Sequence, residues 1–246
     1  MAKFEIRFFS KSLLRKTEVK LVVPSLALHT AMAVRDPRFY QNDAEKFPLC
    51  IMLSGFADDN DSWLASGGLQ ELCDKYRIAA VSVSGENKWY LDSSPIDNWH
   101  TFLEQELPDF LYGQFAKLDR EKKPVLCGVS MGGFGALWNG LTGPEHYGAV
   151  VALSPALRPD GYLADEEKFP ALKTLFAQTK ETRPYTYLAI GEQDFIAAPS
   201  REFDGWLAEN EIGTRYRFVP GYDHSWSFWR VQIEDAMAEL KACRII

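Results

Sequence analysis

Short apolar runs that alternate with helical patterns are the feature that most constrains the fold of this chain. The runs are rich in β-branched or other apolar residues with almost no polar interruption, as expected of strands covered on both faces. They occupy residues 49–53, 79–83, 125–129, 150–153, 185–190 and 216–219. Amphipathic or apolar helical patterns lie between them, at 63–76, 99–112, 132–141, 200–210 and 226–240. This alternation predicts an α/β fold, with a mostly parallel sheet, right-handed crossovers and helices on both faces.

Two further strands are predicted ahead of this series. Residues 4–9 and 19–23 flank a polar turn and predict an N-terminal antiparallel hairpin, which brings the central sheet to about eight strands. No linker or repeat divides the 246 residues, so residues 1–246 are expected to form one domain. Pro108 falls inside the pattern 99–112 and should kink or interrupt that helix.

The connection 156–183 is long for a link between two strands. It contains Pro159, Gly161 and Pro170, and part of it, around 168–180, is expected to be helical. We expect either a small cap over a cleft or an ordinary crossover helix.

Composition excludes several classes of protein. The formal net charge of −7 disfavours nucleic acid as a partner, and the basic stretch 3–20 is better interpreted as a solvated hairpin than as an anion-binding patch. No apolar run is long enough to span a membrane, and the N-terminal residues lack the apolar block of a secretory signal. The four cysteines are widely separated, which predicts reduced thiols, no metal site and a cytoplasmic protein: Cys50, Cys73, Cys127 and Cys243.

The motif that carries chemistry is Gly128-Val129-Ser130-Met131-Gly132. It matches G-x-S-x-G and lies directly after an apolar strand and before a glycine-rich helix start, where a sharp turn would hold the serine above the sheet edge. The helix N-terminus would direct backbone N–H groups at developing negative charge. Ser130 is therefore the candidate nucleophile.

A serine nucleophile needs a base and an orienting acid, and this motif is followed by the acid and then the histidine. His146 and His224 follow Ser130, and His224 is preferred because its loop comes after the last predicted strand. Asp194 follows strand 185–190 and is the preferred acid, with Glu192 as a weaker rival. Asp223 adjoins His224 in sequence, and Asp204 lies in a helical pattern, so neither is favoured.

Backbone donors for an oxyanion are expected from two places. One is the amide of Met131, directly after the nucleophile, and the other is the amide of Phe56 in the loop after strand 49–53, where Gly55 allows close approach. Aromatic residues near these loops could wall a substrate pocket, although ordinary packing explains each equally well: Trp63, Trp89 and Trp226. Cys127 precedes the motif but should point into the interior and be inert.

These residues resemble a known family, the tributyrin esterase branch of the esterases that also include esterase D, S-formylglutathione hydrolases and mycolyltransferases. The resemblance covers the chain nearly from end to end. Its most specific pieces are Gly128-Val129-Ser130-Met131-Gly132-Gly133-Phe134 and Gly221-Tyr222-Asp223-His224-Ser225-Trp226, joined by Leu53-Ser54-Gly55-Phe56, Asp61-Ser62-Trp63, Trp89-Tyr90 and Glu106-Leu107-Pro108. It implies an α/β-hydrolase fold, with Ser130, Asp194 and His224 as the triad and Phe56 and Met131 as the oxyanion hole.

The chain departs from this family in two respects. Many relatives have His-Gly where it has Ser54-Gly55, and residues 87–98 and 156–183 match only loosely. We expect a serine carboxylesterase that hydrolyses small short-chain acyl esters through an acyl-enzyme, without a cofactor or metal.

The sequence leaves other functions open. A thioesterase of the S-formylglutathione hydrolase type, an acetyl or feruloyl esterase of plant polysaccharides, and an inactive scaffold used for binding are the alternatives. The expected partner is a small ester, with neither nucleic acid nor membrane, and self-association into a homo-oligomer stays open.

Overall fold

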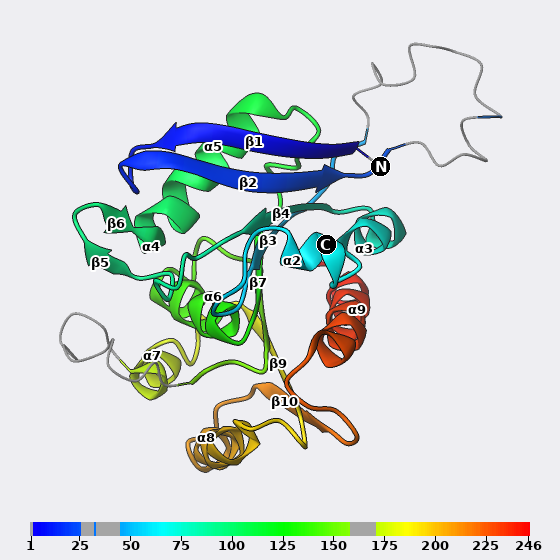
Figure 1. The fold of residues 1–246 in the computed structure, drawn as a ribbon. Helices are drawn as coiled ribbons and strands as arrows, with labels where there is room; N and C mark the ends of the chain where they lie inside the picture. Colours follow the sequence, from blue (N-terminus) through cyan, green and yellow to red (C-terminus); the bar gives the residue numbers. More distant parts are fainter. Residues whose placement is uncertain (1, 26–31, 33–44, 158–170) are drawn as a thin grey trace.

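The computed structural model describes residues 2–25, 32, 45–157 and 171–246, and its centre is an eight-stranded sheet in the order β1-β2-β4-β3-β7-β8-β9-β10 (Figure 1). The strands β1 (Ala2–Ser10) and β2 (Arg15–Val23) form an antiparallel hairpin. The strand β2 also pairs with β4 (Ala79–Val83), again antiparallel. The remaining pairings within this eight-stranded sheet are parallel, through β3 (Leu49–Leu53), β7 (Val125–Val129), β8 (Ala149–Leu153), β9 (Tyr185–Gly191) and β10 (Arg215–Val219). The predicted hairpin and mostly parallel sheet are therefore confirmed.

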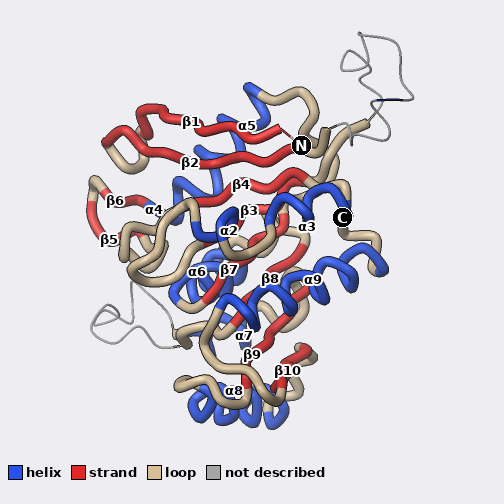
Figure 2. Tube along the Cα trace, turned by 45° about the vertical axis from the view of Figure 1, so that its right-hand side comes forward, coloured by secondary structure: helices blue, strands red, loops and turns tan. Residues whose placement is uncertain are grey.

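Helices cover both faces of this sheet (Figure 2). On one face, α3 (Leu69–Tyr76) and α9 (Trp226–Ala242) pack against the central strands through side chains such as Leu72, Phe228 and Ile233. On the other face lie α6 (Met131–Thr142), α7 (Leu172–Gln178) and α8 (Ala197–Glu209), together with the broken helix around residues 99–114. The strands β3, β4, β7 and β8 are buried at every position, which explains why their sequences show no alternation.

Two predicted helices are interrupted. The pattern 63–76 is divided into α2 (Ser62–Ala65) and α3 because Gly67 and Gly68 intervene, and Gly68 takes a left-handed φ of 66°. The pattern 99–112 becomes α4 (Trp99–Thr101), a π-helical turn η2 (Phe102–Glu106) and α5 (Leu107–Gln114). Pro108 lies in the first turn of α5, so the interruption expected there takes the form of a π-turn just before the proline.

The sequence did not predict the small ribbon of β5 (Asp92–Ser94) and β6 (Asp97–Asn98). These strands are three and two residues long and half-buried, too short to show a period.

In the long connection, α7 falls within the predicted helical stretch. Its Leu172, Leu175 and Phe176 are buried in the core on the α6 side of the sheet, as in an ordinary crossover helix. The remaining question of a cap concerns residues 158–170, which lie outside the described residues.

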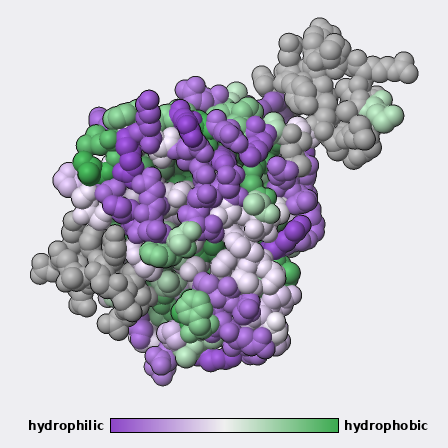
Figure 3. Space-filling model, in the orientation of Figure 1, coloured by the Kyte–Doolittle hydropathy of each residue, from purple (hydrophilic) through white to green (hydrophobic). Residues whose placement is uncertain are grey.

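The surface of the face shown in Figure 3 is mostly hydrophilic, with small and separate hydrophobic patches. Among the described residues, no helix has the length and apolar character that crossing a bilayer requires.

Candidate active site

Ser130 occupies the sharp turn between β7 and α6. Its φ of 53° and ψ of −115° are far from the ordinary strand or helix values, and its side chain is partly exposed. The turn is fixed on both sides, because the Ser130 amide donates to Leu153 O at 3.0 Å and the Ser130 carbonyl accepts from Phe134 N at 3.0 Å. The structure thus has the strained strand-to-helix turn that the motif predicts.

The flanking glycines are required by close backbone approach. A Cβ at Gly128 would lie 2.0 Å from Gly132 O, and a Cβ at Gly132 would lie 2.3 Å from Leu53 O. No larger side chain fits at either position without moving the backbone.

His224 and Asp194 are brought together by the loops after β10 and β9. His224 Nδ1 lies 2.8 Å from Asp194 Oδ2, and Asp194 Oδ1 accepts the amide of Ile196 at 3.0 Å. The Asp194 side chain is completely buried, whereas His224 keeps 15% exposure. One carboxylate oxygen therefore holds the imidazole while the other is held by the backbone.

The electrostatics favour an ionised Asp194. Burial alone would raise the pKa of this carboxyl, but hydrogen bonds from His224, the Ile196 amide and the Ser154 hydroxyl outweigh it and hold the pKa below its usual value. A negative carboxylate beside Nδ1 keeps the proton on that nitrogen, which leaves Nε2 free to accept one.

The loops that carry these two residues are packed tightly against each other. Gly191 ends β9, and a Cβ there would lie 2.2 Å from Tyr222 O, two residues before His224. The same Tyr222 carbonyl accepts the Gln193 amide at 3.0 Å. The separation of acid and histidine is therefore set by backbone contacts.

The segment 153–156 after β8 connects this pair to the nucleophile. Ala156 N donates to Ser130 O at 3.1 Å, and Ser154, fully buried, hydrogen-bonds to Asp194 and accepts from Trp229 Nε1 at 3.1 Å. Ser154 could not be predicted as part of the site, since one serine after a strand carries no distinguishing signal in the sequence.

The loop 54–57 after β3 lies against Ser130. A Cβ at Gly55 would be 3.6 Å from Ser130 Cβ, which places this backbone in contact with the nucleophile. Phe56 extends outward with 59% exposure, and Met131 is buried at the first position of α6. The two predicted amide donors, those of Phe56 and Met131, thus belong to segments on either side of Ser130.

Aromatic side chains surround the site unequally. Trp89 and Trp226 are partly exposed, but Trp63 has no exposed surface, and its Nε1 donates to Leu53 O at 3.1 Å. Trp63 packs edge-on against Trp226 with ring centroids 5.1 Å apart. It therefore holds Trp226 in place and does not itself line a pocket. Phe195, for which the sequence carries no motif, is 78% exposed and lies 4.6 Å from the His224 ring, centroid to centroid.

The rival residues are engaged elsewhere. Glu192 pairs with Arg201 at 3.1 Å, and Asp223 accepts from Ser225 Oγ at 2.5 Å. His146 Nε2 lies 3.3 Å from Glu104 Oε1. Burial raises the pKa of the Cys127 thiol, so it is not a reactive thiolate.

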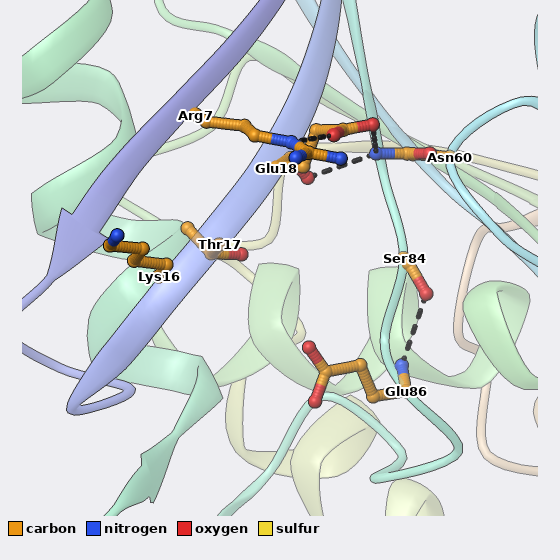
Figure 4. Close-up of a pocket in the computed structure, with 7 residues that line it drawn as sticks. All are labelled: Arg7, Lys16, Thr17, Glu18, Asn60, Ser84 and Glu86. Atoms are coloured by element: carbon orange, nitrogen blue, oxygen red, sulfur yellow. Dashed lines mark hydrogen bonds and ion pairs between the residues drawn. The ribbon is translucent and has the colours of Figure 1, made fainter.

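A polar groove of about 430 Å³ lies near the N-terminal hairpin, where Asn60 and Ser84, from the loops after β3 and β4, meet β1 and β2 (Figure 4). In this groove Arg7 pairs with the Glu18 carboxylate. The Glu18 backbone carbonyl accepts a hydrogen bond from Asn60 Nδ2 at 3.0 Å. Arg15 likewise pairs with Glu86 and Asp97. These carboxylates neutralise two basic side chains of the hairpin, Arg7 and Arg15. Within the described ranges, no cluster of three or more His, Cys, Asp or Glu side chains could hold a metal ion.

Comparison with known proteins identifies the family. The family model described as Putative esterase matches residues 24–240. The chain belongs to this esterase family. Ester hydrolysis is accordingly its reaction class, as the sequence predicted.

Individual relatives agree with this assignment. The chain is 28% identical to an acetyl esterase of Caldicellulosiruptor saccharolyticus, covering 96% of this chain and 97% of the relative. It is 27% identical to an S-formylglutathione hydrolase of Paracoccus denitrificans (strain Pd 1222), covering 74% and 78% respectively. Among solved structures, the fluorophosphonate-binding serine hydrolase F of Staphylococcus aureus superposes with a TM-score of 0.79 at 17% identity, covering 97% of this chain and 98% of that one. That likeness confirms the α/β-hydrolase fold.

Proposed function

We propose that this protein is a serine carboxylesterase that hydrolyses small short-chain acyl esters through an acyl-enzyme intermediate. The observation that carries the proposal is the hydrogen bond of 2.8 Å between the buried Asp194 carboxylate and His224, at the sheet edge where Ser130 occupies its positive-φ turn. Ser130 is the nucleophile, His224 the general base and Asp194 the orienting acid.

The reaction proceeds in two halves. In the first, Ser130 Oγ attacks the ester carbonyl, His224 Nε2 takes the hydroxyl proton, and the same proton is delivered to the leaving alcohol. In the second, water attacks the acyl-enzyme with His224 again acting as base, which releases the acid and restores the serine. Asp194 remains ionised throughout and stabilises the imidazolium that forms in each half.

The negative oxygen of both tetrahedral intermediates needs donors. The backbone N–H groups of Phe56 and Met131 fill this role in the proposal, and the contact between Gly55 and Ser130 supports it. Because Met131 is the first residue of α6, its N–H is one of the amides that have no acceptor within the helix.

A fluorophosphonate probe tests this assignment directly. Wild-type protein should be labelled at Ser130, and Ser130→Ala should abolish both labelling and the burst of product release. Ser93→Ala, which removes a half-buried serine in β5, should label like the wild type. Full labelling of the Ser130→Ala protein would refute the nucleophile.

A second candidate function is thioester hydrolysis, supported by the relatives named S-formylglutathione hydrolase. The relative named acetyl esterase, which covers more of the chain, supports the ester instead. Turnover of a glutathione thioester, a feruloyl ester and simple acetyl and butyryl esters on one preparation separates these activities. Absence of turnover on all of them, with no labelling, would favour the inactive scaffold.

The cytoplasm is the proposed location. Its support is chemical: the four cysteines are free, three of them buried, and such thiols persist where the medium is reducing. The proposed partner is the small ester itself.

A further inference from the structure

The loop 54–57, here called the oxyanion loop, is contacted by a separate segment, residues 85–90. Tyr90 hydroxyl lies 3.0 Å from Ser54 O and 3.2 Å from Val83 O, so its single proton is shared between these two carbonyls. Asn87 Oδ1 accepts the Ala57 amide at 2.7 Å. One segment therefore touches the oxyanion loop at both of its ends.

These two contacts fix the peptide planes on either side of the expected donor. A peptide unit is planar and nearly rigid, so holding the Ser54 carbonyl sets the whole Ser54–Gly55 unit. Holding the Ala57 amide sets the Phe56–Ala57 unit in the same way. The unit between them is Gly55–Phe56, which carries the Phe56 N–H.

The segment 85–90 is itself held in an unusual conformation. Its φ values are 48° at Glu86, 60° at Asn87, 58° at Trp89 and 59° at Tyr90, all in the left-handed region that side chains other than glycine and asparagine rarely adopt. Such a conformation persists when the surrounding structure over-determines it, and it is common next to functional sites.

The surroundings of Tyr90 supply that over-determination. Its ring is completely buried between two glycines: a Cβ at Gly85 would lie 2.5 Å from Tyr90 Cζ, and one at Gly135 would lie 2.5 Å from Tyr90 Cδ2. The Tyr90 carbonyl accepts Asn139 Nδ2 at 3.1 Å, which ties the segment to α6, the helix that begins with Met131. The two expected oxyanion donors are thereby connected through one tyrosine.

We propose that the segment 85–90 sets the direction of the Phe56 N–H, with Asn87 and Tyr90 as positioning residues that pin the two ends of the oxyanion loop. The inference rests on the proposed function, since it assigns a task to residues beside the proposed oxyanion hole. Neither side chain is assigned a contact with substrate, so both act through the Phe56 amide.

The test uses Tyr90→Phe and Asn87→Ala, each with a matched control. Tyr147→Phe removes another buried tyrosine hydroxyl, which has no hydrogen-bond partner among the described residues. Asn210→Ala removes another exposed asparagine, at the end of α8. A lost oxyanion donor costs about 10²–10³ in kcat, so a misdirected donor should cost about tenfold with KM nearly unchanged. The control variants should stay within about twofold of the wild type.

A second readout separates positioning from general loosening. Oxyanion donors bind oxygen better than sulfur, so the wild type should turn over an acetyl ester much faster than the matching thionoester. Tyr90→Phe and Asn87→Ala should narrow that ratio, while both control variants should keep it.

Failure of the positioning role and failure of the proposed function would give different results. A wild-type protein with no esterase activity would refute the function. An active wild type whose Tyr90→Phe and Asn87→Ala variants keep full kcat, or lose kcat with an unchanged ester-to-thionoester ratio, would refute the positioning role. Since Asn87 is exposed, its variant remains informative even where Tyr90→Phe fails to fold.

Discussion

Asp194 and His224, thirty residues apart in sequence, meet through Oδ2 and Nδ1 at 2.8 Å. The carboxylate is completely buried, yet its pKa lies below the usual value because the hydrogen bonds it accepts outweigh the effect of burial. A carboxylate in this state orients the imidazole and stabilises its charged form. We therefore expect Asp194 to be ionised and neutral His224 to carry its proton on Nδ1.

Replacing Asp194 by Asn should reduce kcat by about 10⁴, because the amide no longer favours the tautomer with the proton on Nδ1. The variant should fold, since the side chain keeps its shape. The measurement is steady-state turnover of an acetyl ester, with the thermal midpoint recorded on the same preparation.

Glu192→Gln and Asp223→Asn are the matched controls for this change. Glu192 is paired with Arg201 and Asp223 with Ser225, so both substitutions should have small effects on turnover. If Glu192→Gln were the more damaging change, the acid would have to be reassigned.

The close approach of Gly191 to Tyr222 makes a second prediction. Gly191→Ala would introduce a Cβ 2.2 Å from Tyr222 O, so the backbone before His224 must shift. A displacement of about 1 Å can cost about 10²-fold, so we expect a loss of that order in kcat.

Gly205→Ala provides the comparison for Gly191→Ala. Gly205 lies inside α8, and no atom of the part of the chain that the structure describes comes within 4 Å of its Cβ position. Alanine there should leave turnover unchanged and stabilise the fold by about 0.5–1 kcal/mol. Equal kcat values for the two alanine variants would contradict the idea that Gly191 sets the position of the histidine.

The sheet was predictable because its strands are buried on both faces. Runs such as 49–53 and 125–129 agree with β3 and β7 at both ends, since no solvent-facing positions blur the pattern. The break between α2 and α3 follows from the Gly67–Gly68 pair, which a search for apolar periodicity passes over. The π-turn η2 depends on the packing of residues 102–106, which local preference does not specify.

The part of the candidate site that was predictable is the part given by the serine motif and by the order of the strands. Ser130 has a motif, and His224 and Asp194 follow from strand order, because parallel strands bring their carboxyl ends to one edge. Trp89-Tyr90 is part of the family resemblance, but the contacts of Asn87 with Ala57 and of Tyr90 with Ser54 were not predictable, since they depend on four left-handed residues. Such backbone conformations are imposed by tertiary packing, as the glycines on either side of the Tyr90 ring show.

Glu106 should make the stability of the fold depend on pH in the acid range. It accepts Ser10 Oγ at 2.8 Å, Lys11 N at 2.6 Å and Ser12 N at 2.8 Å, and so holds the turn of the N-terminal hairpin. Burial alone would raise the pKa of this carboxyl, but these hydrogen bonds lower it overall. A lowered folded-state pKa means that the stabilisation is present above the unfolded pKa, about 4.3, and is lost as the pH falls through the folded value.

Glu106→Gln should therefore lower the free energy of unfolding at pH 7 by about 1 kcal/mol, allowing for partial exposure of the side chain. The difference from the wild type should shrink as the pH falls below about 4. Urea unfolding at pH 7 and at a pH below about 4 measures this difference in the free energy of unfolding. Glu121→Gln, at an exposed position, is the control. A difference that stays constant with pH would show that the charge of Glu106 is not responsible.

The acyl-chain preference should follow from the aromatic side chains around the site. Phe56 and Phe195 are both large and exposed. Phe56 belongs to the oxyanion loop, with its ring centroid 6.5 Å from that of Trp89, and Phe195 lies beside His224. Each methylene adds about 0.8 kcal/mol, or about fourfold in binding, while apolar wall remains to receive it. Two phenyl rings offer apolar surface to only a few methylenes, which favours short acyl chains.

Across p-nitrophenyl esters, kcat/KM should peak between acetyl and about hexanoyl and then fall steeply, with no activation at a lipid interface. Phe195→Ala should lower kcat/KM for butyryl more than for acetyl, because only the longer chain reaches a side wall, whereas Phe9→Ala removes an exposed phenyl of β1 and should affect both equally. Activity that rises steadily through dodecanoyl esters would require a long acyl tunnel and would contradict the short wall.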